Sequence, residues 1–60
     1  MTDLNPMLEP GQIVRHPTEA GWGLGQVQSN INGKITVMFE QAGKIVIDGR
    51  KIALLPVFDV

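Results

Sequence analysis

The 60-residue chain has no cysteine, no tyrosine and a single histidine, and its aromatic residues are one tryptophan and two phenylalanines. Without cysteine it has neither disulfides nor thiolate metal ligands. Five basic residues against six acidic ones give a formal charge of −1, which argues against duplex binding by bulk positive charge. The longest apolar run, "IALLPVF", is far shorter than the roughly 20 residues of a membrane-spanning helix.

The beginning of the chain, "MTDLNPMLEPG", contains two prolines and no basic residue. It therefore lacks the positively charged start and apolar core of a signal peptide, and we expect a cytoplasmic protein. The polar residues and prolines predict a flexible N-terminal arm over residues 1–10, which Leu8 partly anchors. Because 43% of the chain is apolar, the remainder has enough material for one small core. We predict a single domain over residues 11–60.

The rest of the chain reads as short strands separated by turn residues. Asn32 and Gly33 lie between two strand-like runs, and this pair favours the positive φ angles of a type I′ hairpin turn. Pro17 ends the first run, because proline lacks the N–H that a central strand must donate. The predicted strands are about 12–16, a second from Leu24 to the Asn-Gly turn, 34–40, 44–48, and a closing strand after a short turn at 54–56.

Alternation within two of these strands indicates which side chains face the core. In "KITVMFE", Ile35, Val37 and Phe39 share one face of the strand. In "KIVID", Ile45 and Ile47 share one face and Val46 lies on the other. In the strand 34–40, the outward residues are Lys34, Thr36, Met38 and Glu40.

No ten-residue segment has a helical period, and the chain is too short for a two-layer sandwich. Four to five antiparallel strands of this length can instead form a small, strongly bent barrel, which also protects the sheet edges. We therefore predict an all-β domain, a small SH3-like barrel of the Tudor or KOW kind. Its one long loop is "PTEAGWGLG".

The segments "GQIVRHPTEAGWGLGQVQS", "GKITVMFEQAGKIVI" and "ALLPV" resemble a family of short bacterial domains of unknown function. That family is similar to the Tudor-like C-terminal domain of the bacterial DNA repair helicases related to UvrD and PcrA. The shared pattern is G-x-x-V-x-H, a glycine-rich loop leading into G-x-V, a V-x-F strand, a glycine turn with a lysine, and a leucine-rich end. The matching positions are Gly11, Val14, His16, Gly23, Gly25, Val27, Val37, Phe39, Gly43, Lys44, Leu54 and Leu55.

The resemblance implies a protein-docking role in transcription or repair, with RNA polymerase as the partner. The RNA polymerase-binding domains of transcription-repair coupling factor and of the CarD regulators share the same barrel. One position departs from the helicase pattern: the lysine there commonly stands two residues after the glycine, whereas Lys44 follows Gly43 directly.

His16 is the one side chain that suggests catalysis or metal binding. A single imidazole does not make a zinc site, because such sites need three or four protein ligands and the carboxylates are scattered along the chain. Ser29 and Thr36 lie in strand contexts without a nucleophile-elbow signature. We therefore expect no enzyme activity, no metal and no cofactor, and interpret His16 as a hydrogen-bonded anchor of the long loop.

The stretch "GWGLG" is a second unusual feature. It lacks the Lys-Ser/Thr ending of a phosphate-binding loop, and turn geometry explains its glycines. Trp22 then has two interpretations, a partner contact or a lid over the open end of the barrel, and the two are compatible.

The sequence thus predicts a non-enzymatic protein-interaction module. A methyl-lysine cage needs more aromatic residues than this chain has. Single-stranded nucleic-acid binding is the alternative. It needs a basic groove with stacking aromatics, and the five basic residues supply charge, but the chain has almost no aromatic surface to expose. The partner's identity and the oligomeric state stay open. The predicted partner-binding residues are Trp22, His16, Arg15, Lys34, Met38 and Lys44.

Overall fold

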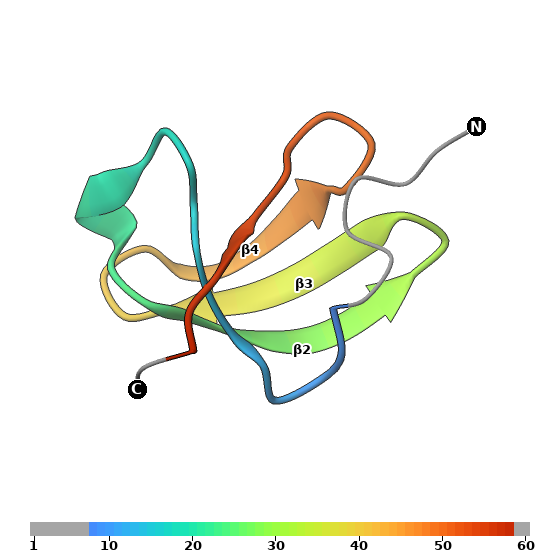
Figure 1. The fold of residues 1–60 in the computed structure, drawn as a ribbon, viewed down its shortest axis with the longest axis horizontal. Helices are drawn as coiled ribbons and strands as arrows, with labels where there is room; N and C mark the ends of the chain where they lie inside the picture. The colour runs from blue at the N-terminus through green and yellow to red at the C-terminus, as the bar shows by residue number, and fades with distance from the viewer. Residues whose placement is uncertain (1–7, 59–60) are drawn as a thin grey trace.

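The computed structural model describes residues 8–58. Five strands form one antiparallel sheet in the order β4-β3-β2-β1-β5, as Figure 1 shows in part. The strands are β1 (Ile13–Arg15), β2 (Gly25–Ile31), β3 (Lys34–Phe39), β4 (Gly43–Asp48) and β5 (Leu55–Pro56), with one 3-10 turn, η1 (Ala20–Trp22), between β1 and β2. The predicted all-β domain of four to five antiparallel strands is confirmed. The predicted N-terminal arm falls mostly on residues 1–7, which lie outside the described residues.

The sheet is open but strongly bent. Figure 1 shows the segments of β1 and β5 crossing over the layer formed by β2, β3 and β4. β4 and β5 are the two ends of the strand order, so hydrogen bonding does not close the sheet within residues 8–58. The core lies inside the bend.

The core contains the residues that the alternation predicted. Ile35, Val37 and Phe39 of β3 and Ile47 of β4 are buried, and Ile45 packs against them. The other buried apolar residues are Leu8, Val14, Val27 and Leu54.

Leu8 is part of this core, although the sequence places it in the arm. The side-chain amide of Asn30 donates a hydrogen bond to the carbonyl of Leu8 (3.1 Å), and the N–H of Gly11 donates to the carbonyl of Val27 (2.8 Å). Asn30 faces inward because the β2–β3 register shifts between Val27 and Ser29. This bulge re-aims the end of β2. Strand alternation alone does not reveal it.

The tight turn between β2 and β3 forms as predicted. Asn32 has φ 51° and Gly33 has φ 79°, so both central residues adopt the left-handed conformation of a type I′ turn. The N–H of Gly49 donates to the carbonyl of Gly33 (2.7 Å), which ties the end of β4 to this turn.

Two local predictions need correction. Residues 54–56 were expected to form a turn before the last strand, but Leu55 and Pro56 form β5 itself. Proline is tolerated there because β5 is an edge strand. The sequence showed no helical period in the long loop, yet η1 forms there, and it is closed by hydrogen bonds from the N–H of Trp22 to the carbonyl of Glu19 (3.0 Å) and from the N–H of Gly23 to the carbonyl of Ala20 (3.3 Å). A single 3-10 turn is too short to leave a helical period in the sequence.

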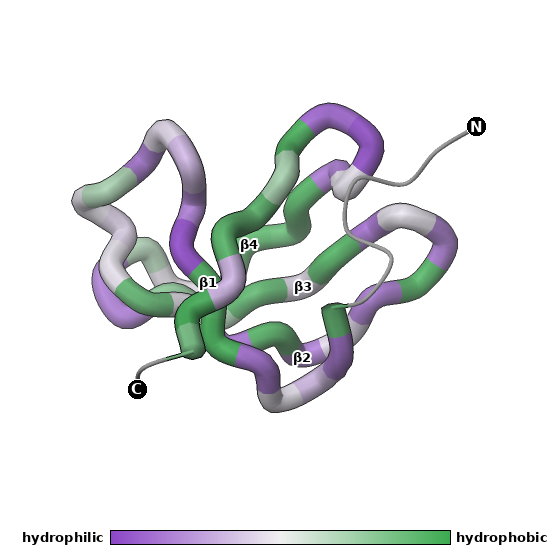
Figure 2. The backbone as a smooth tube through the Cα atoms, viewed as in Figure 1, coloured by the Kyte–Doolittle hydropathy of each residue, from purple (hydrophilic) through white to green (hydrophobic). Residues whose placement is uncertain are grey.

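Hydropathy follows the architecture. Figure 2 shows hydrophobic residues along β3 and most of β4, a more hydrophilic β2, and a hydrophilic loop after β4. Within residues 8–58, no helix has the length and apolar character needed to cross a membrane.

Candidate functional site

His16 anchors the loop between β1 and β2. Its side chain is buried, and Nδ1 accepts hydrogen bonds from the backbone N–H groups of Thr18 and Glu19, both at 3.1 Å. A nitrogen that accepts two N–H groups carries no proton, so the ring is in the tautomer with hydrogen on Nε2. The structure confirms the predicted anchoring role. Its burial leaves the ring little surface to offer a partner.

Trp22 closes one end of the core. Its ring lies edge-on to His16, with a centroid distance of 4.7 Å, and edge-on to Phe39 at 5.2 Å. The side chain is half-buried. These contacts agree with the interpretation of Trp22 as a lid, and its remaining exposed surface leaves the partner contact a prediction.

The tip of β3 holds this loop in place. The N–H of Gln41 donates to the carbonyl of Trp22 (3.0 Å), and the N–H of Glu40 donates to the carbonyl of Leu24 (2.8 Å). The Glu40 carboxylate in turn accepts the N–H of Leu24 (3.0 Å). The loop is thus attached to the β3–β4 turn as well as to His16.

The three loop glycines serve different purposes. Gly23 has φ 77°, which favours glycine. Gly25 does not have positive φ, but a Cβ there would lie 2.5 Å from Cγ1 of Val37 and 2.7 Å from Cδ1 of Phe39. Gly21 has neither constraint. The expectation that all three permit sharp turning is therefore wrong for Gly21 and Gly25.

The outward side of β2, β3 and β4 carries three exposed apolar side chains. Ile31 is 64% exposed, Met38 45% and Val46 62%. Cross-strand pairing places Thr36 beside Val46, Met38 beside Lys44, and Ile31 beside Lys34. We call this surface the outer face, consisting of Ile31, Lys34, Thr36, Met38, Lys44 and Val46.

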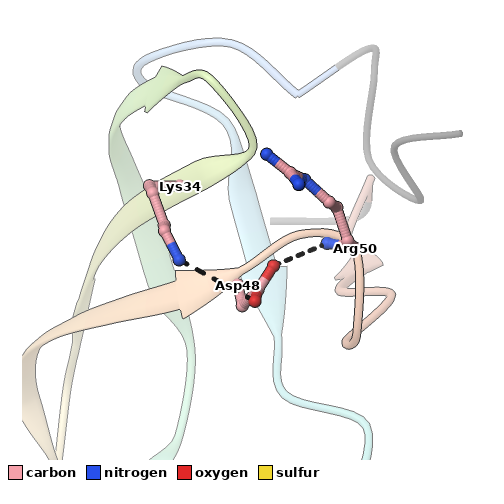
Figure 3. Close-up of polar contacts among 3 residues, drawn as sticks. All are labelled: Lys34, Asp48 and Arg50. Carbon is pink, nitrogen blue, oxygen red and sulfur yellow. Dashed lines mark hydrogen bonds and ion pairs between the residues drawn. The ribbon is translucent and has the colours of Figure 1, made fainter. Parts of the chain in front are cut away.

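A charged cluster borders the outer face. Nζ of Lys34 lies 3.8 Å from Oδ2 of Asp48, and Oδ1 of Asp48 accepts the N–H of Arg50 at 3.1 Å (Figure 3). This hydrogen bond lowers the pKa of Asp48. Desolvation opposes the shift, while the positive charges of Lys34, Lys51 and Arg50 reinforce it.

The structure divides the six predicted partner residues into three groups. Lys34, Met38 and Lys44 lie together on the outer face. His16 and Trp22 meet at the end of the core, and Arg15 is exposed on β1 opposite Leu55. Sequence reasoning did not include Val46 and Ile31 among the partner-binding residues. Alternation had already placed Val46 outward, but only the β2 bulge establishes that Ile31 shares its side.

No cluster of three His, Cys, Asp or Glu side chains suited to a metal occurs in the described part of the chain. No ligand-sized cavity was found in the structure of residues 8–58. The absence of enzyme activity, metal and cofactor stays a prediction.

Fold and surface together define a small all-β domain with one apolar outer face. The chain belongs to the family described as "Protein of unknown function (DUF3553)", which matches residues 8–57. The predicted membership in a family of domains of unknown function is confirmed, and the match includes Leu8. No curated protein and no solved structure matches the chain.

Proposed function

We propose that this domain is a non-enzymatic protein-docking module that binds through the outer face. The observation that carries the proposal is the exposure of Ile31, Met38 and Val46 on one side of the sheet. Apolar side chains gathered on a rigid sheet favour binding, because they bury area without a large loss of conformational entropy.

The positive charges on the outer face indicate what kind of partner surface it can bind. Lys34 and Lys44 stand beside the apolar residues of the outer face, and both are exposed. A complementary surface has an apolar centre and an acidic rim. The proposed partner is therefore a protein with such a surface in the bacterial transcription or DNA-repair machinery, and RNA polymerase is the first to test. The resemblance to the helicase modules and CarD domains supports this choice.

Direct binding to purified bacterial RNA polymerase tests the proposal. Met38→Glu introduces a negative charge at the centre of the outer face, whereas Arg15→Glu, on β1 and outside that face, replaces a positive charge by a negative one and so makes the larger charge change. We expect Met38→Glu to weaken binding at least about tenfold, since it adds a charge repelled by an acidic rim. Arg15→Glu should bind nearly as the wild type does. No wild-type binding, or equal effects of both variants, contradicts the proposal.

Single-stranded nucleic-acid binding is the second candidate. Three of the five basic residues, Lys34, Arg50 and Lys51, gather around Asp48 and produce a local excess of positive charge. This alternative requires measurable affinity for an oligonucleotide at low salt that falls steeply as salt increases. An affinity that is absent at low ionic strength excludes it.

A further inference from the structure

β4 is the exposed edge of this sheet. It hydrogen-bonds to β3 on one side, and the strand order places no neighbour on its other side within residues 8–58. The opposite edge, β5, has two residues, one of them Pro56, and so offers little to a further strand. β4 has six residues without proline. Its edge can accept another strand by backbone hydrogen bonding at Lys44 and Val46. The carbonyl of Asp48 already accepts the N–H groups of Lys51 (3.0 Å) and Ile52 (3.1 Å), so it is not counted among the groups that bond to an added strand.

The outward side chains of β4 are self-complementary. Lys44, Val46 and Asp48 alternate to the same side of the strand, with one positive and one negative charge each two residues from Val46. Lys44 is exposed, and the side chain of Asp48 is 32% exposed. An antiparallel copy of β4 centred on Val46 therefore places each Lys44 opposite the other copy's Asp48.

Other arrangements of two β4 strands fit less well. Centring the antiparallel pair on Ile45 puts Lys44 opposite Val46, and centring it on Ile47 puts Val46 opposite Asp48. A parallel arrangement in register brings like charges together. Only the register centred on Val46 joins apolar to apolar and positive to negative side chains, and opposite-charge cross-strand pairs stabilise a sheet.

We propose that the chain forms a two-fold symmetric homodimer by antiparallel pairing of β4 with β4 of a second copy. The pairing joins two five-stranded sheets into one and sets the two outer faces side by side, with each Val46, 62% exposed in the single chain, next to the other. The two Val46 side chains meet at the two-fold axis, with a Lys44–Asp48 pair on each side. A contact of one strand per partner is small, so the dimer is expected to be weak.

Sedimentation equilibrium of the 60-residue chain, without any partner, measures this association up to about 1 mM. We expect a monomer–dimer equilibrium that weakens with salt. Lys44→Glu and Asp48→Lys should each weaken dimerisation about tenfold or more, since each makes both symmetry-related pairs repulsive. Mixing the two variants should restore a heterodimer, because the glutamate introduced in one copy would then face the lysine introduced in the other. Arg15→Glu, on β1, is the matched control and should dimerise as the wild type does.

Asp48 also accepts the N–H of Arg50, so folding of Asp48→Lys is checked by circular dichroism. Hydrogen exchange provides a measurement that does not need this variant. Alternate β4 amides should gain protection as wild-type concentration increases, and Lys44→Glu should abolish the gain. A chain that stays monomeric at about 1 mM and low salt overturns the proposal, because the β4 edge then does not pair with β4 of a second copy. Unchanged dimerisation of Lys44→Glu also overturns it. Neither result depends on RNA polymerase, so failure here is distinct from failure of the docking function.

Discussion

At the scale of single residues, Gly25 is required because a side chain would not fit beside its neighbours, and not because its backbone has a positive φ angle. Its missing Cβ leaves room for Val37 and Phe39, which would otherwise lie closer than real Cβ contacts allow. We expect Gly25→Ala to destabilise the domain by about 1–3 kcal/mol, the usual cost of overpacking. Gly21→Ala has open space and should change stability by less than about 0.5 kcal/mol. Urea unfolding of both variants measures the difference, and equal stabilities would contradict this account.

His16 makes a second residue-scale prediction. Replacing it by Ala leaves the N–H groups of Thr18 and Glu19 without their acceptor, which should destabilise the domain by about 1–3 kcal/mol. His16→Asn places a side-chain oxygen close to the position of Nδ1 and should recover part of the loss. Thermal unfolding compares the two variants. If Asn is no more stable than Ala, the hydrogen bonds to Nδ1 are not what stabilises the loop.

Asp48 gives the stability a dependence on pH. Because its pKa is lower in the folded than in the unfolded chain, its contribution is present above the unfolded value of about 4 and is lost as the pH falls through the folded value. Unfolding free energy should therefore decline as the pH decreases below about 4. Asp48→Asn cannot titrate and should show a shallower decline in denaturant unfolding across this range. An identical decline would assign the effect to other carboxylates.

The residues that sequence reasoning identified correctly are those whose role depends on local patterns. Alternation placed Ile35, Val37 and Phe39 in the core, and the Asn32–Gly33 pair indicated its turn type. The role of Gly25 depends on side chains more than ten positions away, so nothing local distinguishes it from Gly21.

At the scale of elements, the loop that contains Trp22 is a covering segment attached at both ends. Trp22→Ala removes the ring contacts with His16 and Phe39, but the side chain is only half-buried. The loss of stability should therefore be about 2 kcal/mol, less than the roughly 3–5 kcal/mol expected for Phe39→Ala. Denaturant unfolding of both variants tests the order. Tryptophan emission of the wild type should lie between those of exposed and fully buried indole, and a fully buried spectrum would contradict the half-buried lid.

The elements themselves were largely predictable, because short β-branched runs between turn residues specify strands directly. What the sequence did not reveal were the bulge in β2 and the strand at 55–56, since each is fixed by pairing with a distant segment. The bulge is what turns Asn30 toward Leu8 and Ile31 outward. The outer face therefore became complete only with the tertiary structure.

At the scale of the whole molecule, the bent sheet has two surfaces with different roles. Its inside is occupied by the core, and its outer face presents three of the five large exposed apolar residues of the described chain, the other two being Leu55 and Phe58. Sequence analysis predicted Lys34, Met38 and Lys44 for binding but emphasised Trp22, whose contacts with His16 and Phe39 now assign part of its ring to stability. The proposed docking surface has accordingly moved from the loop to the sheet.

The most direct test of this claim is a map of the bound surface by nuclear magnetic resonance. The ¹⁵N-labelled chain is titrated with purified RNA polymerase at low salt, and amide signals are followed residue by residue. We predict that signal loss begins at Thr36, Met38 and Val46 on the outer face, while the amides of the loop at 18–24 change least. Signal loss confined to that loop, or no change in any amide at saturating polymerase, would contradict docking through the outer face.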